Sequence, residues 1–325
     1  MVICAYTTER WSRLRDAVSS VLRQSPAPDE VLVVIDHNRA LEDRAREHLE
    51  PRGVRVVASL GPRGLSGARN TGTARASGDV LVFLDDDAVA QPDWLAGHTR
   101  HYDDPEVIGV GGLVTPRWEC GAPSWFPPEF GWVVGCSYLG QPTQEAEIRN
   151  PIGANMSFRH SALVDVGGFS DSLGRVGATP SGCEETELSI RAAAACPGRK
   201  IVYEPEAVVL HHVPVGRSSW AYFRSRCWRE GLSKADVSRL SDPRRALAAE
   251  RSYAVKVLPA GVRRNVSDAL RRLEVAPLTR ALTICIGFTL TTAGYAAGRA
   301  RLGSRDMRPQ RMRPAASSTP GGAAG

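Results

Sequence analysis

Three consecutive aspartates at residues 85–87 carry the clearest chemistry in the chain. Adjacent carboxylates repel one another, so a fold that collects them on one turn usually supplies a cation that offsets the repulsion. Oxygen ligands at this spacing suit Mg²⁺ or Mn²⁺ bridging to substrate phosphates, which makes Asp85 and Asp87 candidate metal ligands. The alternative for such a run is a solvated turn without a metal.

Three further groups could act beside these aspartates. Glu184 and Glu185 form a carboxylate pair that could supply a general base, although acids at a helix start also favour the helix dipole. Arg69 follows a glycine-rich turn, where its guanidinium could reach a phosphate or hold an aspartate; the alternative is a surface residue. His211 could be a metal ligand or a structural histidine.

The elements that must position these residues can be read from the apolar pattern. Short apolar runs alternate with helical periodicity from residue 2 to about residue 112, which is typical of βαβ units around a largely parallel sheet. Ligands of such sheets bind beyond the carboxyl ends of the strands, where Asp36 and Asp85 are expected. The expected strands cover residues 2–5, 30–35, 54–58 and 80–84. The expected helices run from residue 11 to Ser25, over residues 40–49, from the glycine-rich turn to Ala76, and over residues 92–101.

The middle of the chain, residues 109–151, is rich in glycine, proline and tryptophan, which predicts irregular loops. Its tryptophans, Trp118, Trp125 and Trp132, either wall a pocket or pack as ordinary hydrophobic side chains. The elements expected next are a helix over residues 183–196 and a strand over residues 200–209 that Pro205 interrupts.

Composition and charge narrow the class of protein. Of 325 residues, 42% are hydrophobic and 23% charged, as in globular proteins. The chain has 41 Lys and Arg and 35 Asp and Glu. From Pro243 onward there are 15 basic and 4 acidic residues, and before Pro243 there are 26 basic and 31 acidic residues. The acidic first part argues against nucleic acid as a partner, whereas the basic end suits anionic lipid.

Cysteine usage and the first residues bear on the compartment. Seven scattered cysteines without a CxxC pair indicate a reducing compartment, with neither a disulfide scaffold nor a zinc site. Met1 leads directly into an apolar run that reads as an incomplete first strand, so we expect no signal peptide. These features predict a cytoplasmic protein.

The chain is expected to become helical from about residue 216. An apolar stripe between arginines is followed by residues 281–298, which carry no charge. A membrane span needs about 20 apolar residues, so this stretch could span a membrane, lie on its cytoplasmic face or cap the catalytic domain. Residues 304–325 have the composition of a disordered tail. The stripe comprises Val262, Val266, Leu270 and Leu273.

In their order and spacing, these elements resemble family 2 inverting glycosyltransferases of the GT-A fold. The resemblance runs from residue 2 to about residue 215 and implies an α/β fold with a mixed, largely parallel sheet flanked by helices. We therefore expect a catalytic domain over residues 1–215, a helical region over residues 216–303 and a disordered tail. The matching segments are residues 2–7 with Glu9, 33–36, 67–70, 83–87, 153–155, 167–169, 184–185 and 205–211.

This resemblance implies transfer of a sugar from a nucleotide-sugar donor, by expectation a uridine diphosphate sugar, to a hydroxyl of a glycan, a lipid-linked or a small-molecule acceptor. It also implies Mn²⁺ or Mg²⁺ as cofactor. The family usually has aspartate where this chain has Glu185, so the base falls on Glu185, with Glu184 as the alternative. By the same resemblance Ala5, Glu9, Asp36, Arg69 and Asp85 lie on the nucleotide, and Asp87, Asp85 and His211 on the metal.

Two alternatives remain at this point. A sugar nucleotidyltransferase would share the nucleotide site, but it normally has a glycine-rich phosphate loop with Arg and Lys after the first strand. Here residues 5–9 read Ala-Tyr-Thr-Thr-Glu. A non-catalytic carbohydrate-binding protein of the same fold is the second alternative.

Overall fold

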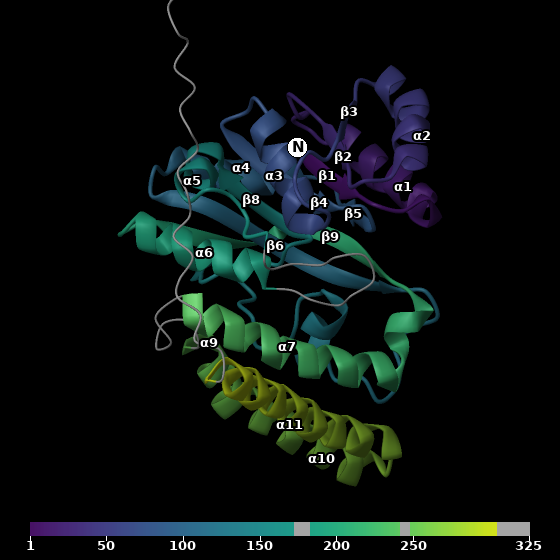
Figure 1. Cartoon of the computed structure of the whole chain (residues 1–325). Helices are drawn as coiled ribbons and strands as arrows, with labels where there is room; N and C mark the ends of the chain where they lie inside the picture. The colour runs from purple at the N-terminus through teal and green to yellow at the C-terminus, as the bar shows by residue number, and fades with distance from the viewer. Residues whose placement is uncertain (172–182, 241–247, 304–325) are drawn as a thin grey trace, which may run out of the picture.

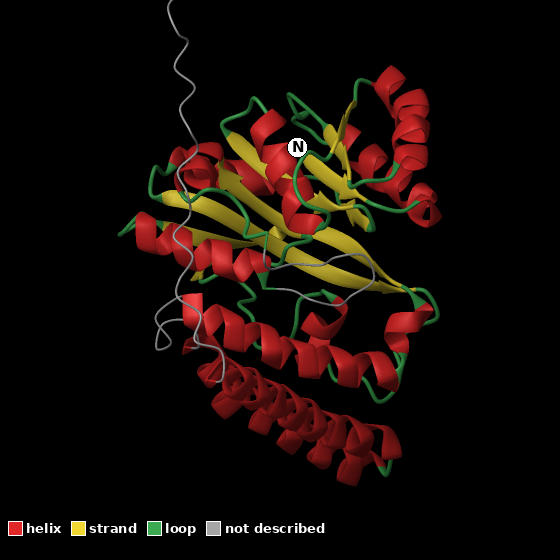
Figure 2. Ribbon diagram, in the orientation of Figure 1, coloured by secondary structure: helices red, strands yellow, loops and turns green. Residues whose placement is uncertain are grey.

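The computed structural model describes residues 1–171, 183–240 and 248–303 and is built around one mixed sheet (Figure 1). Its strands follow the order β3-β2-β1-β4-β8-β6-β9-β5, and β7 pairs with β9. Helices lie on both sides of this sheet (Figure 2). The predicted tail, residues 304–325, lies outside the described residues.

The first half of the chain forms the predicted βαβ units. The strands β1 (Val2–Ala5), β2 (Leu32–Ile35), β3 (Arg55–Ala58) and β4 (Val80–Asp85) pair in parallel. The helices between them are α1 (Trp11–Leu22), α2 (Arg39–Leu49) and α3 (Leu65–Arg75), and the 3-10 turns are η1 (Thr8–Arg10) and η2 (Glu50–Arg52). Their bounds agree with the sequence prediction within a few residues.

Alternation along the strands assigns the helices to the two faces of the sheet. Ile3 belongs to one buried cluster with side chains of α1 and α2, whereas Val2 belongs to another with side chains of α3 and of the later helices α5 (His160–Asp165) and α6 (Glu184–Ala195). Because neighbouring residues of a strand point to opposite faces, both faces are buried.

The second half of the sheet is mostly antiparallel. The strand β8 (Asn155–Arg159) pairs antiparallel with β4 and with β6 (Val107–Trp118). The long strand β9 (Lys200–Val213) pairs in parallel with β6 and antiparallel with β5 (Ala88–Ala90) and β7 (Ala146–Ile148). The mixed sheet expected from the sequence is therefore confirmed, and β1 to β4 supply its parallel part.

The prediction of irregular loops over residues 109–151 is wrong for the first part of that range. Residues 107–118 form β6, and its glycines serve close packing between strands: a Cβ at Gly112 would lie 2.1 Å from the carbonyl oxygen of Ala207. Further along, Trp125 stacks on Trp220 with ring centroids 4.3 Å apart, which favours hydrophobic packing. Trp118 instead borders a cavity of about 360 Å³ that also contacts Asp87.

Two other predicted bounds differ from the structure. The helix α4 (Trp94–Thr99) begins two residues after Pro92 because Asp93 has a left-handed backbone, with φ of 62°. The strand β9 continues to Val213, and Pro205 coincides with a bulge in its pairing with β6. The remaining turns of this region are η3 (Arg100–Asp103), η4 (Pro128–Val134) and η5 (Val215–Ser218).

The C-terminal region is helical, as predicted, and lies along the lower side of the molecule in Figure 1. The helix α11 packs against both α7 and α10. Ion pairs fasten this region to the rest of the chain: Arg264 contacts the fully buried Glu129 at 2.6 Å, and Arg149 contacts Glu250 at 2.6 Å. The elements are α7 (Trp220–Leu240), α9 (Ala248–Ser252), the π-helical turn η6 (Tyr253–Val257), α10 (Leu258–Arg272) and α11 (Val275–Gly303).

One buried amide links several elements of the second half. The Oδ1 atom of Asn155 accepts hydrogen bonds from Trp94 and His98 of α4, at 2.7 and 2.8 Å. Its Nδ2 atom donates to the carbonyl oxygens of Leu113 in β6 and Ala207 in β9, at 3.0 and 2.7 Å. Asn155 is fully buried, so no solvent replaces these bonds if its amide is removed.

We therefore expect Asn155→Ala to lower the free energy of unfolding by about 3 kcal/mol, because two buried donors and two carbonyl oxygens lose a partner. Chemical denaturation followed by circular dichroism measures this change. Gln144→Ala, at an exposed position, is the control and should leave stability nearly unchanged. A loss below the error of the measurement for Asn155→Ala would contradict the assignment of a structural role.

Candidate active site

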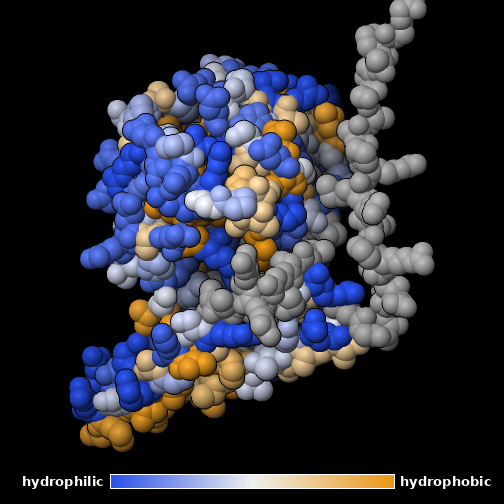
Figure 3. All heavy atoms as spheres, turned by 90° about the vertical axis from the view of Figure 1, so that its left-hand side faces the viewer, coloured by the Kyte–Doolittle hydropathy of each residue, from blue (hydrophilic) through white to orange (hydrophobic). Residues whose placement is uncertain are grey.

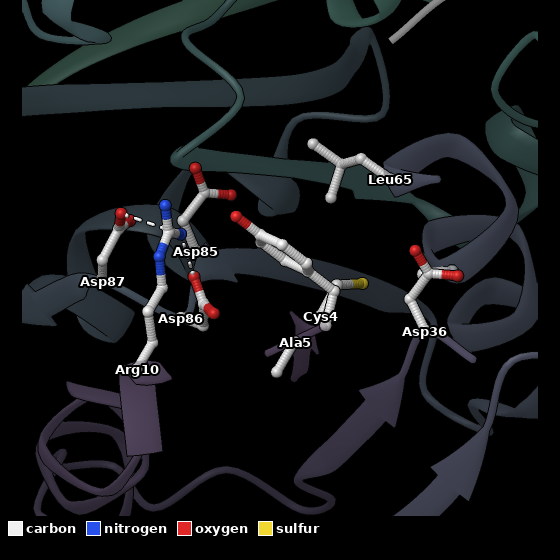
Figure 4. A pocket seen from close by; sticks show the side chains of 10 residues that line it. Cys4, Ala5, Arg10, Asp36, Leu65, Asp85, Asp86 and Asp87 are labelled. Atoms are coloured by element: carbon white, nitrogen blue, oxygen red, sulfur yellow. Dashed lines mark hydrogen bonds and ion pairs between the residues drawn. The ribbon is translucent and has the colours of Figure 1, made fainter. Parts of the chain in front are cut away.

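A pocket opens at the carboxyl ends of β1, β2 and β4 (Figure 4). Four of the predicted site residues line it, namely Ala5, Asp36, Asp85 and Asp87. Glu9 does not: it is exposed on η1. The lining residues are Cys4, Ala5, Tyr6, Arg10, Asp36, Leu65, Ala68, Asp85, Asp86 and Asp87.

Asp36 is held in place by the glycine-rich turn. Its Oδ2 accepts a hydrogen bond of 3.0 Å from the backbone N–H of Gly64, and its Oδ1 lies 2.7 Å from Nδ1 of His37. Gly64 has φ of 130°, a conformation that side chains with a Cβ rarely adopt. The glycine is therefore needed to aim this N–H at the aspartate.

Asp85, Asp87 and His211 form a compact group of potential metal ligands. One ligand atom from each lies within 4.8 Å of the others. The pairing of Ala88 with His211 between β5 and β9 brings the histidine to the aspartates, and the N–H of His212 donates to the carbonyl oxygen of Asp87 at 2.8 Å. Two carboxylates and an imidazole fit Mn²⁺ or Mg²⁺.

Protein cations balance the buried aspartates in this arrangement. One guanidinium nitrogen of Arg10, Nη1, lies 3.0 Å from Asp86 and 3.1 Å from Asp87. Arg217 lies 3.9 Å from Asp87, and Nε2 of His211 lies 3.2 Å from it. A metal at Asp87 would compete for this carboxylate with Arg10 and Arg217, and His211 would have to lose its proton before its imidazole could bind the ion.

The pKa values reflect the same balance. Burial alone would lower the pKa of His211, but the Asp87 carboxylate outweighs it and raises that pKa to about 10. Burial raises the pKa of Asp86 to about 7, with the charge of Asp87 adding to the effect. For Asp87, attraction by His211, Arg10 and Arg217 exceeds the effect of burial and holds its pKa well below the usual range.

Arg69 connects this acidic turn to the second carboxylate pair. Its Nη1 donates to Glu184 at 3.1 Å, and its Nη2 donates to Asp85 at 3.3 Å and to the carbonyl oxygen of Gly153 at 2.9 Å. The side chain is only 2% exposed, so the surface alternative for Arg69 is wrong. A Cβ at Gly153 would lie 2.9 Å from the guanidinium, which explains a glycine there.

Glu184 and Glu185 begin α6 on the far side of Arg69. Cys183, with φ of 75°, turns the chain into this helix. Burial raises the pKa of Glu185 to about 8, and the Glu184 carboxylate beside it adds to the rise. Oε2 of Glu184 has no hydrogen-bond partner among the described residues. The first turn of α6 thus carries one carboxylate that is paired with Arg69 through a single oxygen, Glu184, and one whose raised pKa favours its protonated form, Glu185.

Sequence reasoning did not single out Arg10, which affects the charge of the pocket, or Tyr6, which affects its shape. Arg10 neutralises the aspartates, and its guanidinium also lies over the Tyr6 ring, 5.3 Å from the centroid. Arg10 sits just before a helix that follows the first strand, at the sheet edge where the aspartates were expected. That placement was the available signal, but nothing local distinguishes Arg10 from the other arginines of this region.

A second group of potential metal ligands lies elsewhere, at His101, Glu145 and Glu204. Glu204 is fully buried, and its carboxylate already pairs with Arg100 and His101. The backbone N–H of Glu206 also donates to it at 2.8 Å. This group is thus satisfied as an ion-pair network, and only the exposed Glu145 is left to offer a ligand atom.

Comparisons with known proteins show the family of this chain. Residues 1–167 match the family model described as Glycosyl transferase family 2. The chain is 33% identical over 236 residues to a glucosyl-dolichyl phosphate glucuronosyltransferase of Haloferax volcanii, covering 72% of this chain and 75% of that protein.

Two solved structures share the fold. A mannosyltransferase from Pyrobaculum calidifontis, in complex with GDP-Man and Mn²⁺, is 18% identical with a TM-score of 0.57, covering 94% of this chain and 87% of that one. GalNAc-T7 with UDP, GalNAc and Mn²⁺ is 16% identical with a TM-score of 0.51, covering 74% of this chain and 50% of that one. Together with the family match, they show that the chain is a glycosyltransferase of the GT-A fold and belongs to family 2.

Proposed function

We propose that this glycosyltransferase moves a sugar from a nucleotide-sugar donor to an acceptor hydroxyl in one inverting displacement, with Mn²⁺ or Mg²⁺ held by Asp85, Asp87 and His211. The observation that carries the proposal is the Arg69 bridge, which keeps the aspartate group and the Glu184–Glu185 pair at one end of the sheet. A donor phosphate and an acceptor hydroxyl can then be addressed by neighbouring carboxylates.

The pocket supports a nucleotide in the first half of the chain. Asp36 offers a fixed carboxylate to a ribose hydroxyl, and Tyr6 offers a ring beside the apolar Ala5 and Leu65. Arg69 and Glu9 remain proposed contacts of the nucleotide. The two solved neighbours hold UDP and GDP-Man, so the fold itself does not choose the base. We keep uridine diphosphate as the proposed carrier.

In the proposed reaction, Glu185 removes the proton of the acceptor hydroxyl as its oxygen attacks the anomeric carbon. The bond from that carbon to the diphosphate oxygen breaks on the opposite face, so the configuration inverts. When bound, the divalent ion offsets the charge on the departing diphosphate. Arg10 and Arg217, which contact Asp87 in the absence of metal, would be available to pair with the same charge. Glu184 is the alternative base.

We propose a lipid-linked acceptor. The Haloferax relative is named for a glucosyl-dolichyl phosphate substrate, which favours a lipid-linked acceptor over a free glycan or a small molecule. We assign catalysis to residues 1–215 and attachment and acceptor presentation to residues 216–303. A cytoplasmic location remains a prediction.

The metal proposal predicts that Mn²⁺ raises the melting temperature of the protein. At a hundred times its Kd, a ligand that binds only the native state adds about 2.7 kcal/mol of stability. Asp87→Asn should lose this Mn²⁺-dependent shift, whatever its own melting temperature without metal. Glu145→Gln, in the other potential ligand group, should keep it. An equal shift in wild type and Asp87→Asn would place the metal elsewhere.

The transfer proposal predicts release of nucleoside diphosphate from a sugar donor. A panel of nucleotide sugars is incubated with Mn²⁺ and glucosyl-dolichyl phosphate, and free nucleoside diphosphate is measured. Glu185→Gln should reduce release at least a thousandfold while still binding the donor, because the base is lost and the pocket is not. Glu185→Asp should retain measurable activity.

The matched control for this experiment is Glu187→Gln. Glu187 lies on the same helix, but its carboxylate pairs with Arg191. Transfer should therefore persist in this variant. Full turnover by Glu185→Gln would refute the base assignment, pyrophosphate as product would indicate a nucleotidyltransferase, and no product from any donor would indicate a binding protein.

The raised pKa of Glu185 predicts a pH dependence. A base must be deprotonated to accept a proton, so transfer should rise about tenfold per pH unit below pH 8 and level off above it. Glu184→Gln removes a neighbouring negative charge and should move the midpoint to lower pH. The measurement is the transfer rate between pH 6 and pH 9 at saturating donor and metal. A rate that falls between pH 6 and pH 8 would contradict this role.

A further inference from the structure

The helices α10 and α11 expose large apolar side chains on the side that faces away from the sheet. Leu273 is 90% exposed, Leu270 73% and Val275 72%. Figure 3 shows such side chains gathered along the lower edge of the molecule, over these helices. The exposed apolar residues of α10 and α11, together with Leu273 between them and Val255 of η6, we call the C-terminal apolar surface: Val255, Val266, Leu270, Leu273, Val275, Leu278, Leu282 and Phe288.

The opposite face of α11 is committed to close packing within the protein. A Cβ at Gly294 would lie 2.3 Å from the carbonyl oxygen of Trp228 in α7, and one at Gly298 would lie 2.6 Å from the Cβ of Ala235. Nearer its start, Gly287 lies against Phe130 and Phe223. Glycines at these positions let residues 287–298 of α11 approach α7 closely, so α11 is a fixed part of the molecule.

By length and composition, residues 275–301 of α11 could cross a bilayer. Its packing argues otherwise, because α7 would have to enter the bilayer with it. The helix α7 carries a partly buried ion network of Arg226, Glu230 and Lys234, which extends to Glu250. Charged groups are costly in hydrocarbon. The exposed face of α11 can be buried in lipid only if the helix lies along the membrane surface.

The charge around the C-terminal apolar surface suits an anionic partner. Residues 258–303 contain seven arginines against two acids, Asp268 and Glu274. Arg263, Arg271 and Arg272 of α10 are exposed. An apolar face bordered by arginines is the pattern of helices that lie in the headgroup region, where arginine pairs with lipid phosphate. A protein partner would not require this excess of one charge.

The two helices are tied firmly enough to orient the whole molecule. Glu129 of η4 accepts from Arg264 of α10 at 2.6 Å, and its backbone carbonyl accepts from the hydroxyl of Tyr253 at 2.6 Å. The helix α7 packs against α11 and also contacts α6, whose first turn holds Glu184 and Glu185. This helix therefore connects the C-terminal apolar surface to the candidate site.

We propose that the C-terminal apolar surface docks on an anionic lipid bilayer, with α11 lying parallel to the membrane plane and not crossing it. The apolar side chains enter the boundary between headgroups and acyl chains, and the arginines pair with lipid phosphates. This attachment does not depend on the donor, the metal or the base proposed above. It would hold the first turn of α6 at a constant height above the lipid.

Flotation of the purified full chain with vesicles tests the proposal. We expect the wild type to float with vesicles that contain phosphatidylglycerol and to float much less with phosphatidylcholine alone. Leu273→Asp combined with Leu278→Asp should lower the bound fraction roughly tenfold, because two apolar contacts are replaced by charges that anionic lipid repels. Val164→Asp is the matched control: Val164 is 62% exposed on α5 and should bind as the wild type does.

A second variant separates charge from apolar burial. Arg271→Gln combined with Arg272→Gln should reduce flotation with anionic vesicles and leave the weak binding to neutral vesicles unchanged. Alkaline carbonate should release the wild type from the vesicles. Retention after carbonate would show a span, and an equal loss in Val164→Asp would show a nonspecific effect. A wild type that does not float, or that buries this surface in a dimer, would also overturn the proposal.

Discussion

The arrangement of the site depends on one buried arginine. Arg69 is almost fully enclosed and holds Asp85 with one guanidinium nitrogen and Glu184 with another. These two acids lie 99 positions apart in the chain and belong to different elements, so the fork geometry of a guanidinium fixes both at once. Removing a buried charge that has two partners leaves both uncompensated. The distance between the aspartate group and the start of α6 is therefore set by this side chain.

The other half of the site rests on close packing of strands. Gly112 in β6 allows the backbone of β9 and the amide of Asn155 to approach closely, and β9 then carries His211 to Asp87 at its far end. The bulge at Pro205 shifts the register of β9 against β6 before His211 is reached. Asn155 connects both strands with α4 through four hydrogen bonds. The candidate site is thus assembled from parallel strands that present aspartates and the mixed half of the sheet, which presents the histidine.

The C-terminal helices extend the same core to the outer side of the molecule. Phe223 of α7 and Ile284 of α11 share one buried cluster with Ile3 and Val33 of the sheet, so the helical region is packed onto the catalytic part. The ion pair between the buried Glu129 of η4 and Arg264 of α10 also fixes the position of α10 against the catalytic part. One face of α11 packs against α7, and the apolar side chains on its other face are exposed on the surface of the molecule. The packing thereby connects the candidate active site to the surface that we propose to dock on lipid.

The sequence by itself determined the βαβ units, the position of Asp36 and of the aspartate run at the carboxyl ends of strands, and the helical C-terminal region. These follow from local apolar periodicity and from the rule that parallel strands end at one edge. The tertiary structure alone decided that residues 107–118 form a strand. A glycine-rich segment predicts a loop from the sequence, and its close packing against neighbouring backbone is visible only in the folded chain. The tertiary structure also decided that Arg69 is buried, that Arg10 neutralises Asp86 and Asp87, and that α11 packs along α7. Those outcomes depend on contacts between residues far apart in the chain, which no local pattern encodes.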